Sequence, residues 1–287
     1  MNTTPDLSWL SRLRFVTRKR RQGGSWGERR SARRGAGLEF ADYRDYTPGD
    51  DPRRVDWNLY ARLDRPYVRL FEEEEDLAVT VLLDGSASMT WGERWPVAQQ
   101  LAAALGTLAL LSSDALSAAT LGATPATVWG PTRGRGHIAH WQPWCLALQP
   151  GATGALASAL RQWAARPGRP GLILLITDGY DQDGLSAGIA ALAARRHEVH
   201  LLHLLTPEEL EPPLRGDLRL VDVESGIKRE VTLDRIALEA YARRLDRWQA
   251  ELRALAGKHG GRYALLRTDA PVKRLVLENL RSAGIVR

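Results

Sequence analysis

Two apolar runs, residues 77–83 and 172–176, constrain the fold more than any other part of the chain. Neither run shows the alternation of apolar and polar residues that marks a half-buried strand. A strand that is apolar on both faces is typical of a parallel sheet covered by helices on both sides. Asp84 follows the first run directly, and Asp178 follows the second after Thr177. We therefore predict an α/β domain with two carboxylates at the ends of its buried strands.

Helical and strand patterns alternate along residues 77–287, which predicts a doubly wound, mostly parallel sheet flanked by helices. We expect helices at residues 95–111, 154–165, 184–195, 234–256 and 271–282, and further strands at 114–121, 126–129, 198–205 and 262–266. The short strand at 126–129 is expected to be antiparallel, at the edge of the sheet. A β-hairpin insertion is predicted near 217–232, with its turn at Ser225 and Gly226.

Oxygen-bearing side chains gather where these elements end. Ser86 and Ser88 follow Asp84 at alternate positions, Asp178 ends the later strand, and Thr153 precedes a predicted helix. Ligands bind at the carboxyl edge of open α/β sheets, and hard oxygen donors suit Mg²⁺ or Mn²⁺ better than Zn²⁺. Ser and Asp are also ordinary turn and N-cap residues, so a purely structural role is the alternative.

The donor set Asp84, Ser86, Ser88, Thr153 and Asp178 resembles the metal-ion-dependent adhesion site of von Willebrand factor A domains. The resemblance implies a von Willebrand A-like, Rossmann-like fold and a bound Mg²⁺. It also implies an open coordination position that an acidic side chain of a partner protein completes. One residue departs from the pattern, because Gly154 stands where an acidic residue usually follows the loop threonine.

The segment from residue 37 to 62, with Pro-Gly-Asp-Asp-Pro at 48–52 and Asp56-Trp57, resembles the domain-of-unknown-function 58 family, as do residues 207–210 and 216–226. That resemblance implies a MoxR-type AAA+ ATPase as partner and a chaperone-like role in the assembly or maturation of client proteins. It also makes residues 36–76 a family-specific extension before the von Willebrand A-like domain at 77–287.

The extension has a structural and a functional interpretation. Asp51 and Pro52 are predicted to begin a short helix with Val55, Leu59 and Leu63 on its inner face, and residues 67–71 to form an edge strand leading into the core sheet. The charged residues would then pair with one another while Trp57 packs on the core. On the functional interpretation the same residues contact a partner, and they are Arg44, Asp50, Asp51, Arg53, Asp56 and Trp57.

Charge is unevenly placed along the chain, whose net charge is +6. Arginines crowd residues 1–35, which we expect to form a basic, flexible arm. Such an arm binds nucleic acid or an acidic membrane surface in some proteins, which gives one alternative function. The chain has one cysteine, Cys145, and no apolar stretch near the roughly 20 residues that span a bilayer. We therefore expect a soluble cytoplasmic protein with no transmembrane segment.

Two enzyme classes place similar residues after a buried strand. A haloacid-dehalogenase-type phosphatase needs a second aspartate two residues after the first, where this chain has Ser86. A serine hydrolase needs its serine in a Gly-x-Ser-x-Gly turn, which surrounds neither Ser86 nor Ser88. We therefore expect a protein that is not an enzyme, and we keep a metal-dependent hydrolase using the same oxygen ligands as the alternative.

Overall fold

The computed structural model describes residues 8–17, 38–73, 77–122, 127–151, 155–213, 216–221 and 228–287. These residues form two compact units. Residues 8–17 and those from Leu77 onward make an α/β unit, and residues 38–73 make a smaller unit. The two units are described separately below.

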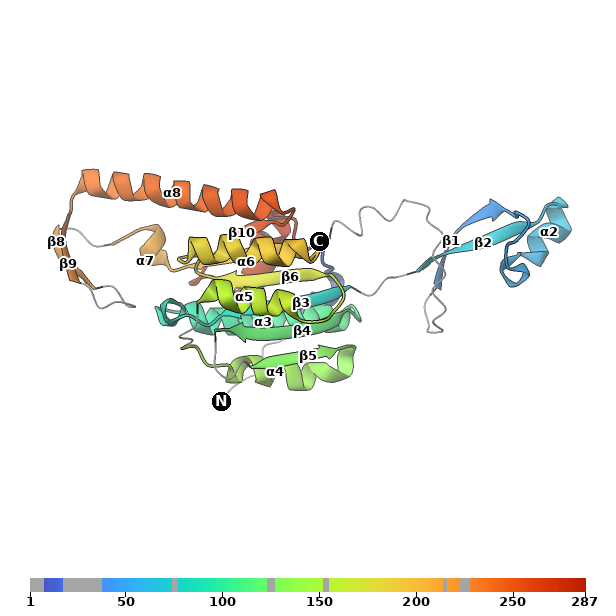
Figure 1. The fold of residues 1–287 in the computed structure, drawn as a ribbon, viewed down its shortest axis with the longest axis horizontal. Helices are drawn as coiled ribbons and strands as arrows, with labels where there is room; N and C mark the ends of the chain where they lie inside the picture. The colour runs from blue at the N-terminus through green and yellow to red at the C-terminus, as the bar shows by residue number, and fades with distance from the viewer. Residues whose placement is uncertain are drawn as a thin grey trace. The chain divides into compact units, whose positions relative to one another are not determined.

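A six-stranded sheet forms the centre of the α/β unit, in the order β10-β7-β6-β3-β4-β5 (Figure 1). Its strands are β3 (Ala78–Asp84), β4 (Ala115–Leu121), β5 (Val128–Thr132), β6 (Leu172–Thr177), β7 (Glu198–Leu205) and β10 (Tyr263–Arg267). All neighbours are parallel except β4 and β5. The mostly parallel sheet and its antiparallel edge strand are confirmed. Strand order reverses between β3 and β6, the position at which such sheets bind ligands.

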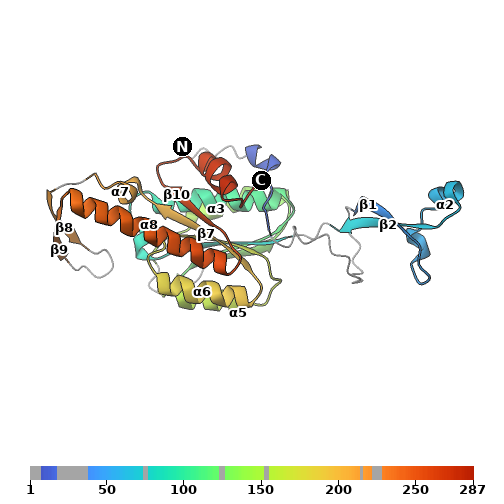
Figure 2. The ribbon, with the colours of Figure 1, turned by 90° about the horizontal axis from the view of Figure 1, so that it is seen from above.

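Helices cover both faces of the sheet. They are α3 (Arg94–Leu111), α4 (Ile138–Ala147), α5 (Leu156–Ala165), α6 (Gln182–Ala194), α7 (Pro207–Leu210), α8 (Arg235–Lys258) and α9 (Val272–Arg274), with 3₁₀-helices η3 (Ala87–Thr90) and η4 (Arg135–His137). Figure 2 shows α3 on one face and α5 and α6 on the other. Buried side chains form one apolar cluster under α3 and α4 and a second under α5, α6 and α8. The predicted helix at 271–282 begins as α9 and continues as a π-helix, η5 (Leu275–Leu280).

The first described residues pack into the core of this unit. A 3₁₀-helix, η1 (Ser8–Arg12), places Leu10 in the cluster under α3, and Leu13 and Phe15 are buried there too. The backbone of residues 14–16 is hydrogen-bonded to residues 285–287. The expectation of a flexible arm over residues 1–35 is therefore wrong for residues 8–17. The apolar residues that alternate with arginines in this segment are buried in the core. Residues 18–37 lie outside the described part of the chain.

The smaller unit consists of an antiparallel pair, β1 (Leu38–Asp45) and β2 (Tyr67–Glu73), joined through two short helices. These are the 3₁₀-helix η2 (Pro52–Arg54), capped by Asp51, and α2 (Trp57–Leu63), capped by Asp56. The predicted helix start at Asp51 is confirmed. A single helix with Val55, Leu59 and Leu63 on its inner face is wrong, because Val55 is extended and Leu63 is exposed. The expected edge strand at 67–71 pairs with β1 and does not enter the central sheet.

A second hairpin, β8 (Gly216–Val221) with β9 (Lys228–Leu233), precedes α8 and confirms the predicted insertion. Asp234 begins α8 by accepting a hydrogen bond from the amide of Ala237. Within the described ranges, every helix is too short or too polar to cross a membrane.

Candidate metal centre

The site begins at the end of β3, where Asp84 stabilises a tight turn. Its Oδ1 accepts a hydrogen bond from the Ser86 amide at 3.0 Å, and its Oδ2 accepts one from the Thr177 hydroxyl at 2.6 Å. The second bond follows from the sheet register, in which Leu83 lies opposite Ile176 and the next residues therefore face each other. Asp84 is thus fixed between β3 and β6, and only 4% of it is exposed.

Asp178 is the first residue after β6, one position beyond Thr177, and a buried histidine holds its backbone carbonyl. The Asp178 carbonyl oxygen lies 2.7 Å from His203 Nε2, so this nitrogen carries the hydrogen and donates it. His203 Nδ1 then accepts from the Tyr263 hydroxyl at 2.8 Å. Burial lowers the pKa of His203 to about 4, which keeps the ring neutral and preserves this tautomer. Gly179 follows Asp178 with φ +77°, a conformation that residues with a side chain rarely adopt, and a Cβ there would lie only 2.9 Å from Leu252. Glycine is therefore required at this position of the turn.

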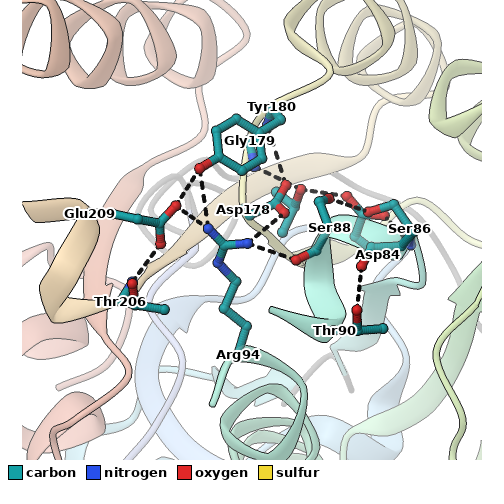
Figure 3. Close-up of polar contacts among 12 residues, drawn as sticks. Asp84, Ser86, Ser88, Thr90, Arg94, Asp178, Gly179, Tyr180, Thr206 and Glu209 are labelled. Carbon is teal, nitrogen blue, oxygen red and sulfur yellow. Dashed lines mark hydrogen bonds and ion pairs between the residues drawn. The ribbon is translucent and has the colours of Figure 1, made fainter. Parts of the chain in front are cut away.

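Two serine hydroxyls lie beside these carboxylates. Ser86 Oγ and Ser88 Oγ are 3.0 Å apart in the turn that leads into η3, and a Ser88 hydrogen bond lowers the pKa of Asp178 (Figure 3). The next hydroxyl along the chain, that of Thr90, donates instead to the Ala87 carbonyl at 2.7 Å. The structure therefore brings together four of the five predicted donors: Asp84, Ser86, Ser88 and Asp178.

The fifth predicted donor, Thr153, lies outside the described residues, as does Gly154. The structure does describe Gly151, two residues earlier. Its amide donates to the Gly85 carbonyl at 3.0 Å, inside the Asp84–Ser86 turn. Gly151, two residues before Thr153 in sequence, is therefore in contact with the predicted site.

A buried arginine connects the site to α7. Arg94, which is 1% exposed, donates to the Ser88 carbonyl at 2.7 Å and lies 3.4 Å from Asp178 Oδ2. Its other terminal nitrogen bonds Glu209 and the Tyr180 hydroxyl, and Tyr180 also donates to Glu209 (Figure 3). Glu209 in turn accepts a hydrogen bond from the Thr206 amide at 2.8 Å. A guanidinium this deeply buried is stable only because carboxylates surround it.

Burial and a neighbouring negative charge raise the pKa of each aspartate: Asp181 acts on Asp84, and Asp84 acts on Asp178. Burial is the larger cause for each, and it outweighs the hydrogen bonds from Thr177 and Ser86 to Asp84. The pKa of Asp178 rises to about 6, because burial and the nearby Asp84 charge outweigh the favourable contribution of Arg94. A buried carboxylate whose charged form is also disfavoured by a nearby negative charge is the environment that a cation relieves.

The donor chemistry fits a hard divalent cation. Carboxylate and hydroxyl oxygens meet at one sheet edge, and Mg²⁺ and Mn²⁺ prefer such oxygen ligands. In the described ranges, no three His, Cys, Asp or Glu side chains gather in a metal-binding group, so this donor set depends on the serine hydroxyls as well as the carboxylates. Asp84, Ser86, Ser88 and Asp178 would be the described residues that hold such an ion, and the hydrogen bonds from Ser86 and Thr177 orient the Asp84 carboxylate.

Comparison with known proteins identifies the family of this chain. The family described as "Protein of unknown function DUF58" matches residues 42–252. The chain belongs to this family. Two mycobacterial relatives, the uncharacterized proteins Mb1516 of Mycobacterium bovis and Rv1480 of Mycobacterium tuberculosis, are each 30% identical over 286 residues. The match covers 96% of this chain and 90% of each relative.

Two solved structures resemble this DUF58 protein at low identity. One is the conserved hypothetical protein BatB of Bacteroides thetaiotaomicron, with a TM-score of 0.44 and 16% identity over 72% of this chain and 98% of that one. The other is described as an aerotolerance-related membrane protein from Bacteroides fragilis, with a TM-score of 0.42 and 17% identity over 70% and 98% of the two chains.

In the smaller unit of the DUF58 protein, the six residues predicted as a partner surface divide into two groups. The charged residues hold the unit together: Arg44 forms two hydrogen bonds to Asp50, at 2.6 and 2.7 Å, and thereby lowers the pKa of that carboxyl. Asp51 and Asp56 cap helices. Arg53 is exposed, with its backbone amide bonded to Asp51.

Trp57 differs from its charged neighbours, because it does not pack on a core as the structural interpretation requires. It is 61% exposed and meets the half-exposed Tyr60 edge-on, with ring centroids 6.1 Å apart.

Sequence reasoning missed Arg94, Glu209 and His203. Arg94 carried a usable signal, since it is the single charged residue of the otherwise apolar helix α3 and its charge therefore needs a buried partner. Glu209 lies in a segment that carried the family resemblance but had no assigned role. His203 stands in a buried strand, where a histidine needs hydrogen-bonding partners, yet nothing local identifies Asp178 as one of them.

Proposed function

We propose that this protein is a non-catalytic, Mg²⁺-dependent protein-binding module of the cytoplasm. Asp84, Ser86, Ser88, Thr153 and Asp178 would hold the ion, and an acidic side chain of a partner would complete its coordination. When bound, the ion supplies positive charge and an open position for a carboxylate. The surrounding residues of this chain orient the donors and shield them from water.

One observation carries the proposal: two buried carboxylates and two hydroxyls converge at the point where strand order reverses. The turn after β3 could serve a purely structural purpose with ordinary exposed residues. Instead, burial and the neighbouring charges raise the pKa values of both aspartates, which costs stability in the absence of a compensating cation. Functional sites tolerate such costs where structural turns gain nothing from them.

The family resemblance makes a MoxR-type AAA+ ATPase our proposed partner, with a chaperone-like role in the maturation of client proteins. The site itself argues for an acidic residue on that partner, since a metal held by a few protein oxygens retains positions for further oxygen ligands.

The first test is calorimetric titration of chelator-stripped protein with MgCl₂ and MnCl₂. The wild type should bind one ion saturably, and Ser88→Ala should bind it at least tenfold more weakly because a ligating hydroxyl is lost. Thr90→Ala is the matched control, since it removes an exposed hydroxyl of the same turn that bonds only Ala87. Equal affinity in Ser88→Ala and Thr90→Ala, or no ion binding even with an aspartate-containing peptide present, would contradict the proposal.

A second test addresses the partner. A purified MoxR-type ATPase should bind the immobilised wild-type protein in Mg²⁺ and be released by a chelator. The immobilised Ser88→Ala variant should bind little of the ATPase, with or without the chelator. Binding that ignores both the chelator and the Ser88 substitution would show that the contact does not use the metal centre. The full chain is used so that the smaller unit and its exposed Trp57 are present.

A further inference from the structure

The Arg94 guanidinium is shared unequally between two carboxylates. It forms a close ion pair with Glu209, whereas its hydrogen bond to Asp178 Oδ2 is 3.4 Å long, which is longer than is usual for a charged pair. Its Nη1 instead makes its short contact, 2.7 Å, with the Ser88 carbonyl. Arg94 is therefore held beside Asp178 without neutralising it fully.

Glu209 is the residue that keeps the guanidinium in this position. Its Oε1 accepts from both Arg94 and the Tyr180 hydroxyl, and its Oε2 accepts from the Thr206 amide. Tyr180 stays protonated as a donor, because burial and Glu209 raise its pKa. Its ring stacks on Trp248 of α8, with centroids 5.3 Å apart. The carboxylate of Glu209 is thus fixed from three sides.

The charge balance among these side chains favours an added cation. Asp84, Asp178 and Glu209 carry three formal negative charges, and Arg94 returns one positive charge, so an excess of two negative charges remains among the four. Without Glu209, the guanidinium would be free to pair with Asp178 alone. It would then compete directly with a cation for that carboxylate, because like charges repel strongly at buried sites.

We infer that Glu209 is a positioning residue that sets the affinity of the metal centre by holding Arg94 away from Asp178. The inference rests on the proposed function and adds a second element to the site. When a divalent cation binds Asp178, it repels Arg94 and strengthens the Arg94–Glu209 ion pair. The segment from Thr206 to Glu211 would therefore become more ordered when the ion binds, so its order depends on occupancy of the metal centre.

The decisive variant is Glu209→Gln, which removes the charge and keeps the shape. A glutamine at this position still accepts the hydrogen bond from the Thr206 amide, as it does in other capped helices. Arg94 loses its partner and turns to Asp178. The dissociation constant for Mg²⁺, measured by calorimetry, should rise at least tenfold. In the double variant Arg94→Met with Glu209→Gln, the competing cation is gone, and the affinity should return to the wild-type value or exceed it.

A matched control separates charge from the position of α7. Tyr241→Phe removes a 2.6 Å hydrogen bond from α8 to the Glu209 carbonyl but leaves the carboxylate and Arg94 unchanged. It should keep the wild-type affinity for Mg²⁺. A loss in Tyr241→Phe as large as that in Glu209→Gln, or a double variant as weak as Glu209→Gln alone, would show that Glu209 acts only by shaping the fold.

Hydrogen exchange supplies a readout that does not depend on affinity. Adding Mg²⁺ should slow amide exchange in residues 206–211 of the wild type and leave it unchanged in Glu209→Gln at saturating ion. Equal Mg²⁺ affinity of wild type and Glu209→Gln would overturn this inference and leave the proposed function standing. Absence of Mg²⁺ binding in the wild type would overturn the proposed function itself, together with the inference.

Discussion

Arg94 shows how one buried side chain can determine the charge of a whole site. It is inserted between Asp178 on one side and Glu209 on the other, with a guanidinium face over the Tyr180 ring at 5.2 Å. Removing either carboxylate would leave a cation buried without its full set of partners, which is costly in proteins. Conservative changes such as Glu209→Gln therefore reveal more than alanine substitutions at these positions.

The raised pKa of Asp178 predicts how stability depends on pH. In the metal-free fold this pKa is about 6, compared with an ordinary value of 3.8. The native chain therefore holds this proton more tightly than the unfolded chain. The stabilisation is fully present below about pH 4 and is lost as the pH rises through 6. The difference between the two pKa values corresponds to roughly 3 kcal/mol.

Asp178→Asn removes this titration, and groups that do not interact with Asp178 cancel when the variant is compared with the wild type at one pH. Asp84, whose charge acts on Asp178, is the neighbouring carboxyl that the substitution also affects. In chelator, urea unfolding should show Asp178→Asn gaining about 2 kcal/mol over the wild type as the pH rises from 4.5 to 8. Mg²⁺ should then stabilise the wild type at pH 8 and not the variant. A difference that stays constant with pH would show that Asp178 titrates normally.

The site residues were accessible from sequence to different degrees. Asp84, Ser86, Ser88 and Asp178 follow apolar strands, and parallel strands bring such ends to one edge, so local patterns were enough. The Arg94–Glu209 pair joins residues 115 positions apart, and no periodicity of either segment encodes it. The exposure of Trp57 was likewise invisible, because it depends on how α2 meets a hairpin whose strands are distant in sequence.

At the scale of elements, the close packing of α3 on α4 depends on a glycine in α3. Gly106 lies in the buried middle of α3, where a Cβ would come within 2.2 Å of the Trp141 ring. Trp141 is fully buried and donates its indole hydrogen to the Ala103 carbonyl at 3.0 Å. The glycine therefore makes room for a fully buried tryptophan of α4.

Gly106→Ala should destabilise the fold by about 1–3 kcal/mol, because overpacking outweighs the better helix propensity of alanine. The matched control is Gly257→Ala in α8, where a Cβ meets nothing within 4 Å. This variant should gain up to about 1 kcal/mol. Urea titrations of both variants test the pair, and stabilisation by Gly106→Ala would mean that Trp141 moves aside at no cost.

Most helices and strands of the α/β unit could be predicted, because apolar runs and helical stripes are local properties of the chain. Pairing between distant segments could not. Residues 67–71 have the composition of an edge strand, and only the presence of β1 decides that they pair outside the central sheet. Leu10, Leu13 and Phe15 lie among arginines, and their burial depends on meeting α3 and the C-terminal residues.

At the scale of the whole molecule, the α/β unit is built from both ends of the chain, with the smaller unit inserted between them in sequence. Phe15 and Val286 form an isolated antiparallel bridge, and both are buried. The first and last described segments thus stabilise each other across the chain's full length.

Phe15→Ala should therefore destabilise the α/β unit by about 3–5 kcal/mol, the usual cost of deleting a buried aromatic ring. Arg12→Ala, an exposed change in the same segment, is the control and should alter stability by less than about 0.5 kcal/mol. Thermal unfolding followed by circular dichroism would measure both. Equal melting temperatures would mean that residues 8–17 detach without consequence.

The position of the donors on β3 and β6 also has a consequence for synthesis. A ribosome completes Asp84 and both serines long before it adds Asp178, and Glu209 follows later still. A chain that ends before residue 153 holds three of the five proposed donors and cannot close the sheet between them. On the proposed mechanism, affinity for the ion is acquired late in translation. A partner that requires the ion would then distinguish a finished chain from a nascent one.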